Sequence, residues 1–196
     1  MTTVLKKNIE GAMLGDKPVI ALYHGKNQIF SAPTRAVFTS SGNFDVPLGI
    51  RSMTVTVIGA GGHGGAGGGL TMWGGTGGIG GLVVKVYEKT ELKSLPAMID
   101  VVVGVCPSAT GAAGQNSSFN NEVIAYGGGG GGNAGYGYNG APGYNGSGSG
   151  GDVTVGAPAV DRTFGGVVYG TGGGGTQGGG GGYPGAQGVV VIEWTY

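Results

Sequence analysis

Residues 50–87 read IRSMTVTVIGAGGHGGAGGGLTMWGGTGGIGGLVVKVY. In Met53–Ile58, β-branched residues recur with a period of two, which is typical of a strand in a sheet. The glycine-rich tract Gly59–Gly81 follows, and Leu82–Tyr87 returns to a strand-like pattern. The stretch therefore predicts two strands joined by a long glycine tract, and the rest of the chain repeats this arrangement.

The glycine tract is not expected to form an α-helix, because each glycine costs about 1 kcal/mol relative to alanine in a helix interior. Few of its side chains are apolar, so its backbone must supply the contacts. Residues 74–81 repeat the pattern Gly-Gly-x. In a polyproline-II helix, three residues per turn bring equivalent groups to one edge every third residue. We therefore expect such helices to pack side by side through backbone hydrogen bonds, with weaker Cα–H···O contacts.

The composition raises the question of disorder, since 51 of the 196 residues are glycine and 8 are proline. However, 39% of the residues are hydrophobic, and many lie in β-branched runs. We expect an all-β fold, an antiparallel sandwich or jelly-roll-like domain with glycine-rich, polyproline-II-like loops. Further strands are expected at residues 98–105, 122–126, 153–160, 164–169 and 189–194, the last with Val190, Ile192 and Trp194 on one face.

The charge distribution argues against several classes of partner. Residues 1–100 carry nine basic and six acidic side chains, whereas residues 101–196 carry one basic and four acidic side chains. Because phosphate recognition needs a basic surface, we expect no nucleic-acid binding. The chain has no polybasic segment and no run of about 20 apolar residues, so we expect no membrane insertion. Residues 1–8 lack the apolar core of a signal peptide, which predicts synthesis in the cytoplasm.

Residues 1–35 are poor in glycine and predict a separate N-terminal module, followed by a glycine-rich β domain at residues 36–196. Residues 19–23 and 28–30 flank a glycine-containing turn and are typical of a β-hairpin. A two-stranded hairpin is marginally stable alone, so we expect it to dock onto the main domain or a partner. The candidate attachment residues are Tyr23, His24, Ile29 and Phe30.

Several short motifs follow one another between residues 36 and 196. They are FTSSGNFDVP (38–47), GAGG (59–62), LP (95–96), IDVVVG (99–104), NSSF (116–119), AYGGGG (125–130) and GAQGVVVIEW (185–194). In this order they resemble the glycine-rich domain of bacteriophage tail and fibre proteins. The hairpin at residues 22–30 also resembles a short N-terminal module of phage structural proteins. The sequence departs from the family after Gly104, where Val105-Cys106-Pro107 stand in place of the usual two or three glycines.

The resemblance implies a virion protein that is exposed on a phage tail or fibre and contributes to recognition of the host surface. Its implied partners are other virion proteins, further copies of itself as a homo-oligomer, and a host cell-surface protein or glycan. A purely architectural virion subunit, such as a collar, head-decoration or tail-tip protein, is the alternative. In that case the glycine tracts would be buried against neighbouring subunits.

Residues 133–150 are the candidate recognition loop, because they combine tyrosine, asparagine, serine and glycine. Tyrosine offers a large amphipathic contact at a small cost in conformational entropy, while asparagine and serine offer adaptable hydrogen bonds. These tyrosines could equally serve to cover the glycine helices. The candidate binding residues are Tyr136, Tyr138, Asn139, Tyr144 and Asn145.

The sequence offers little support for catalysis, a cofactor or a metal. Gly59-x-Gly61-x-x-Gly64 follows a strand, but a dinucleotide-binding motif also needs a helix and an acidic residue about 20 positions further on. His24 and His63 are the only histidines, and Cys106 is the only cysteine, so metal ligands are few and no intrachain disulfide can form. We expect no enzymatic activity, because no set of acid, base and nucleophile is recognisable.

Overall fold

The structure is a computed structural model that describes the backbone of residues 13–14, 17–18, 21–24, 27–31, 34–155 and 162–196. Side chains are described for residues 34–152 and 162–196. Two five-stranded sheets form the body of the chain, and every pairing within them is antiparallel. The predicted all-β, antiparallel sandwich is confirmed.

The first sheet has the strand order β13-β8-β7-β16-β5, and the second has the order β12-β11-β10-β9-β6. The strands of the first sheet are β5 (Arg35–Phe38), β7 (Ser52–Ile58), β8 (Leu82–Glu88), β13 (Val153–Val155) and β16 (Val189–Thr195). Those of the second are β6 (Gly42–Asp45), β9 (Met98–Val102), β10 (Ser117–Phe119), β11 (Val123–Ala125) and β12 (Gly148–Ser149). A single turn of helix, α1 (Lys89–Leu92), follows β8.

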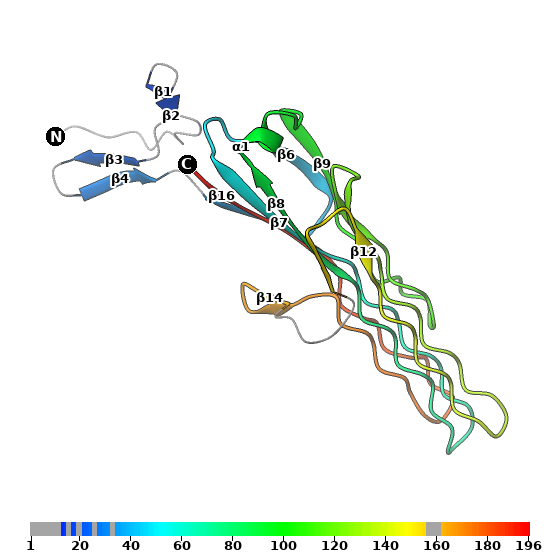
Figure 1. The fold of residues 1–196 in the computed structure, drawn as a ribbon. Helices are drawn as coiled ribbons and strands as arrows, with labels where there is room; N and C mark the ends of the chain where they lie inside the picture. The colour runs from blue at the N-terminus through cyan, green and yellow to red at the C-terminus, as the bar shows by residue number, and fades with distance from the viewer. Residues whose placement is uncertain (1–12, 15–16, 19–20, 25–26, 32–33, 156–161) are drawn as a thin grey trace.

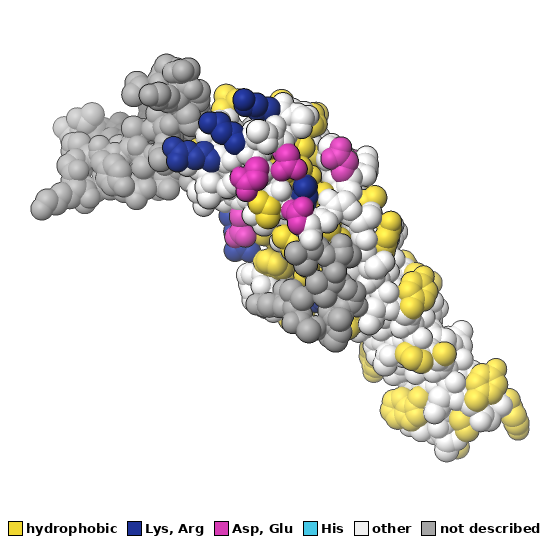
Figure 2. Space-filling view, in the orientation of Figure 1, with side chains coloured by type: hydrophobic (Ala, Val, Ile, Leu, Met, Phe, Trp, Pro, Cys, Tyr) yellow, Lys and Arg dark blue, Asp and Glu magenta, His cyan; other side chains and the backbone are white. Residues whose placement is uncertain are grey.

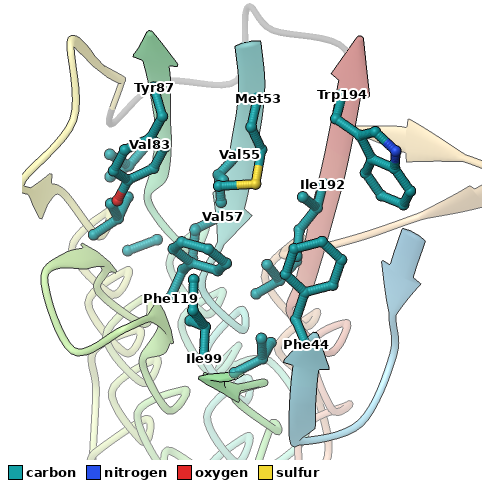
Figure 3. Packing of buried hydrophobic residues seen from close by; sticks show 14 of the residues in the cluster. Phe44, Met53, Val55, Val57, Val83, Tyr87, Ile99, Phe119, Ile192 and Trp194 are labelled. Carbon is teal, nitrogen blue, oxygen red and sulfur yellow. The ribbon is translucent and has the colours of Figure 1, made fainter. Parts of the chain in front are cut away.

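The main core lies between the two sheets and follows from the alternation of apolar residues along the strands. Met53, Val55 and Val57 of β7 point inward, and on β16 the inward residues include Ile192 and Trp194 (Figure 3). Phe119 stands at the centre, and its ring lies 5.9 Å from that of Tyr87. Burying an aliphatic or aromatic side chain of this size stabilises the fold by about 2 kcal/mol. The predicted common face of Val190, Ile192 and Trp194 is confirmed.

The opposite face of the first sheet carries a smaller core, which contains Ile58, Val189, Val191 and Tyr169. The ring of Phe164 packs there against that of Tyr169. The prediction of one strand over residues 164–169 is wrong. Gly165 and Gly166 both adopt positive φ angles, so the chain turns there and forms the hairpin β14 (Thr163–Phe164) and β15 (Val167–Val168).

The long loops between the strands leave the sandwich at one end and run together as a slender projection (Figure 1). We call residues 59–81, 103–116, 126–147 and 170–188 the glycine bundle. The strand predicted at residues 98–105 is shorter in the structure, because β9 ends at Val102 and the chain then enters the bundle. Of the strand predicted at residues 153–160, β13 covers 153–155, and the remainder lies outside the described residues.

The N-terminal part contains two described hairpins. The pair β1 (Met13–Leu14) and β2 (Lys17–Pro18) precedes β3 (Ala21–His24) and β4 (Asn27–Ser31). The predicted hairpin therefore exists, with Leu22 opposite Phe30 and His24 opposite Asn27. The side chains of the four candidate attachment residues, Tyr23, His24, Ile29 and Phe30, lie outside those described. Their role and the division between residues 35 and 36 stay predictions.

Candidate functional site

The glycine bundle is centred on segment 59–67, whose amides donate in rotation to three neighbouring segments. Each neighbour accepts hydrogen bonds from every third amide, as expected of a helix with three residues per turn. The donor–acceptor pairs are Gly59–Gly81, Gly62–Gly78 and Gly65–Gly75; Ala60–Gln115 and His63–Ala112; Gly61–Ala186, Gly64–Tyr183 and Gly67–Gly180, with N···O distances of 2.8 to 3.1 Å. In each set the residue number of the acceptor falls as the residue number of the donor rises, so these three neighbours run antiparallel to the central segment.

The carbonyl groups of segment 59–67 engage two further segments, which run parallel to it. Gly128, Gly131 and Ala134 donate to the carbonyl oxygens of Ala60, His63 and Ala66, and Gly173 and Thr176 donate to those of Gly62 and Gly65. The central segment is thus enclosed by five others, and residues 59–65 are all buried. The bundle has a hydrogen-bonded interior although it lacks a hydrophobic core.

Segment 139–147 forms an outer layer of the bundle. Gly140, Gly143 and Gly146 donate to the carbonyl oxygens of Trp73, Thr76 and Ile79, which belong to one neighbouring segment. In the other direction, the carbonyl oxygens of Ala141, Tyr144 and Ser147 accept from Gly132, Gly129 and Tyr126. Three of the five candidate binding residues, Asn139, Tyr144 and Asn145, therefore stand on a segment that is tied at both edges by backbone bonds.

The backbones approach so closely that a β-carbon would collide with a neighbouring main chain. A Cβ at Gly61 would lie 1.9 Å from the carbonyl oxygen of Thr171, and one at Gly78 would lie 1.8 Å from that of Tyr144. Backbone atoms in a packed bundle cannot move away at small cost. The long glycine tracts are therefore a requirement of packing.

Four asparagine side chains extend the backbone hydrogen bonding. Their Oδ1 atoms accept from backbone amides that point toward the edge of the bundle. The pairs are Asn116 with Gly127 N (3.0 Å), Asn133 with Ala66 N (2.9 Å), Asn139 with Trp73 N (2.8 Å) and Asn145 with Ile79 N (3.1 Å). Asn139 and Asn145, predicted as contact residues, thus also hold the bundle together through their side-chain oxygens.

Val105 and Cys106, which follow Gly104, both accept backbone hydrogen bonds within the glycine bundle. The Cys106 sulfur accepts a hydrogen bond from the amide of Gly185 at 3.1 Å, and the carbonyl of Val105 accepts one from Gln115. Partial burial raises the pKa of the Cys106 thiol. The thiol therefore takes the place of a backbone acceptor between two segments of the bundle.

The sequence Gly59-x-Gly61-x-x-Gly64 does not shape a phosphate site. The amides of these three glycines already donate to Gly81, Ala186 and Tyr183 inside the bundle. His63, in the same segment, is buried, and its Nδ1 lies 2.8 Å from the carbonyl oxygen of Gly64. Among the described residues, no group of three or more metal-ligating side chains comes together.

The far end of the bundle is made of tight turns that carry exposed apolar side chains. Leu70 and Trp73 belong to one turn, in which Gly68 pairs with Met72. Tyr136 and Tyr138 belong to a second, which is closed by a bridge from Gly135 to Tyr138. Between these two turns lies a cleft of about 440 Å³. We call these four residues, Leu70, Trp73, Tyr136 and Tyr138, the tip.

The predicted tyrosines divide between the two roles that the sequence leaves open. Tyr136 is fully exposed and projects from its turn. In contrast, the ring of Tyr138 lies where a Cβ on Gly135 would be, and the ring of Tyr144 lies against Gly129 in the same way. Tyr138 and Tyr144 therefore cover glycine backbone on one side and face solvent on the other. Sequence reasoning missed the contribution of residues 70–73 to the tip. The one available signal was that these bulky residues interrupt a glycine tract.

On the face drawn in Figure 2, the Lys, Arg, Asp and Glu side chains that are coloured by type lie over the sandwich. The glycine bundle contains no Lys, Arg, Asp or Glu. On the sandwich, Lys85 lies 3.1 Å from a carboxylate oxygen of Glu91 and 3.3 Å from one of Asp152. Hydrogen bonds to these two carboxylates raise the pKa of Lys85. The bundle therefore presents a neutral surface of tyrosine, asparagine and glycine backbone.

Comparison with known proteins leaves the family open: no family model matches the chain, and no curated protein matches it. The resemblance to the glycine-rich domain of phage tail and fibre proteins stays a prediction. In the described part of the chain, no helix has the length and apolar character needed to span a membrane.

Proposed function

We propose that the chain is an exposed component of a phage tail or fibre, and that the tip of its glycine bundle contacts the host surface. One observation carries the proposal: apolar side chains stand exposed at the end of a projection whose backbone is hydrogen-bonded throughout its interior. Exposed apolar groups that gather in one place are typical of interaction sites.

The hydrogen bonding of the bundle gives the tip an energetic advantage in binding. A flexible loop loses conformational entropy on binding, at about 1 to 2 kcal/mol for each residue that becomes ordered. Here the segments that lead to both turns are tied to their neighbours before any partner arrives. Preorganisation of this kind raises affinity by lowering the cost of ordering.

The architectural alternative uses the same surface for a different purpose. In that case the tip would be covered by a neighbouring virion subunit. A change at the tip distinguishes the two functions: it would impair adsorption to the host if the tip binds the host surface, and particle assembly if the tip binds a neighbouring subunit. Because Leu70 and Tyr136 are the most exposed apolar side chains of the tip, replacing them leaves the packing of the bundle intact.

The test is to place Leu70→Ser together with Tyr136→Ala in the virion that carries this chain. We expect intact particles with at least tenfold slower adsorption to host cells. Particles with Val167→Ser on β15, an exposed apolar residue of the β14–β15 hairpin and distant in sequence from the tip, serve as the matched control and should adsorb normally. Failure of the double variant to assemble would favour the architectural role, and unchanged adsorption of intact particles would contradict the proposal.

A further inference from the structure

A second cleft lies on the flank of the glycine bundle, close to the sandwich. It has a volume of about 330 Å³, within the range of small-ligand sites. Two tyrosines, Tyr126 and Tyr144, and two asparagines, Asn116 and Asn145, line it together with Ser147 and backbone of nearby glycines. We propose that this flank cleft binds a neutral saccharide.

The tyrosines supply the stacking surfaces that a sugar ring needs. Tyr126 and Gly129, against which the ring of Tyr144 packs, are three residues apart on one segment. At the 3.1 Å rise of a polyproline-II helix, this places them about 9 Å apart along the bundle. One face of many hexose rings consists of C–H groups, and such a face stacks on an aromatic ring, whose π surface is electron-rich. The spacing suits two neighbouring units of an oligosaccharide.

The asparagines supply fixed hydrogen-bond donors. Asn116 Oδ1 accepts from Gly127 N at 3.0 Å and Asn145 Oδ1 accepts from Ile79 N at 3.1 Å. An amide side chain has an oxygen acceptor and an NH₂ donor group, so fixing the oxygen also orients the donor. Within residues 34–152 and 162–196, neither NH₂ group forms a hydrogen bond. Each can therefore donate to a sugar hydroxyl without first breaking an internal bond.

The absence of charge restricts the ligand to a neutral one. No Lys, Arg, Asp or Glu lines the cleft or occurs elsewhere in the glycine bundle. A charged sugar would lose part of its hydration and find no opposite charge, which is unfavourable. A neutral sugar loses only hydroxyl contacts to water, and the asparagines and Ser147 can replace these.

The inference extends the proposed function, on which its biological meaning rests, but it concerns a different surface. Tip residues and cleft residues can be altered separately, and saccharide binding can be measured on the purified chain without particles. If the tip proves not to contact the host, saccharide binding in the flank cleft can still be found. If the cleft binds no saccharide, the proposed function of the tip is unaffected.

The test is a titration of the ¹⁵N-labelled full chain with neutral hexasaccharides of glucose, mannose, galactose and N-acetylglucosamine, and with hexagalacturonate as a charged comparison. We expect at least one neutral sugar to shift the amide signals of Tyr126, Gly127, Gly146 and Ser147. Its affinity should stay constant between 50 and 500 mM NaCl, because surface electrostatics are screened over this range.

Two variants separate recognition from folding. Asn145→Asp keeps an oxygen acceptor for Ile79 N and removes the NH₂ donor, so the Ile79 amide signal should persist while affinity falls at least tenfold. Tyr144→Ala should lower affinity by a similar factor. Tyr183→Ala, which removes an exposed tyrosine from another segment, is the matched control and should bind normally. If Asn145→Asp disturbs the Ile79 signal, Asn116→Asp takes its place.

Three results would overturn the proposal. The first is that no neutral sugar of the panel shifts the four amides. The second is that hexagalacturonate binds more tightly than every neutral sugar. The third is that folded Asn145→Asp or Asn116→Asp and folded Tyr144→Ala bind as well as the unaltered chain.

Discussion

At the scale of single residues, Gly61 shows why this bundle depends on glycine. It is buried in the central segment, and a Cβ there would lie 1.9 Å from the carbonyl oxygen of Thr171 and 2.4 Å from its carbonyl carbon. A methyl group must therefore push two hydrogen-bonded segments apart. The same crowding recurs at Gly64, Gly75 and Gly78, so the spacing of the whole bundle is fixed by positions that tolerate no side chain.

We predict that Gly61→Ala lowers the free energy of unfolding by about 3 kcal/mol, the upper end of the usual cost of overpacking. Gly174→Ala is the matched control, because the added methyl would meet only the Tyr183 ring, at 3.6 Å. It should change stability by less than about 1 kcal/mol. Urea unfolding of the two variants provides the measurement. Equal stabilities would show that the segments can separate at little cost.

At the scale of elements, β8 carries Lys85 and Tyr87 two positions apart on one face of the strand, and the Lys85 Nζ lies 5.6 Å from the centre of the Tyr87 ring. Tyr87 is buried against Phe119, whereas Lys85 meets Glu91 and Asp152. Burial is the largest cause that raises the pKa of Tyr87, to about 12 from its ordinary value of 10. In the unfolded chain this phenol ionises near its ordinary value, so the unfolded state loses its proton first as the pH rises.

This difference predicts a loss of stability in alkali. Between about pH 10 and pH 12 the folded chain binds more protons at Tyr87 than the unfolded chain does, so the free energy of unfolding falls as pH rises. The expected loss from this residue is on the order of 2 kcal/mol. Tyr87→Phe should show a correspondingly smaller decline between pH 9 and pH 11.5, measured by urea unfolding. Parallel declines in the two proteins would contradict the assignment to Tyr87.

The strands that the sequence could predict are those with a clear period of two. Met53, Val55 and Val57 alternate with threonine and isoleucine, and this alternation places β7 correctly. Residues 164–169 look continuous because valine and aromatic residues flank Gly165-Gly166, yet the positive φ angles of these two glycines make a hairpin. Helix α1 is too short to leave a periodic pattern; its capping box of Glu88 and Glu91 was the available signal.

The site was predictable in composition but not in arrangement. The Tyr-Asn-Gly loop was recognisable, and the Gly-Gly-x repeat predicted a period of three. Which segments become neighbours depends on how four distant loops leave the two sheets, and no local pattern encodes that. The turn that carries Leu70 and Trp73 faces the tyrosine turn across a cleft only in three dimensions, and Asn116 reaches the flank cleft from another loop.

At the scale of the whole molecule, the bundle continues the strands of the sandwich outward. β7 passes directly into segment 59–67 and β8 receives segment 74–81. The expectation that glycine tracts pack side by side holds for residues 127–132, whose amides donate to neighbouring segments at five of six positions. It fails for Gly178 and Gly179, which form an exposed turn with positive φ angles.

This continuity predicts the pattern of amide hydrogen exchange. The His63 and Gly64 amides lie in a segment enclosed by five others, so releasing them requires several segments to separate together. We expect both to exchange as slowly as amides of β7, through global unfolding, while Gly69, Gly137 and Gly179 exchange quickly at the turns. Native-state exchange followed by NMR provides the measurement. If His63 and Gly64 exchanged as fast as the turns while β7 stayed protected, the bundle would open independently, and its tip would lose the preorganisation on which recognition depends.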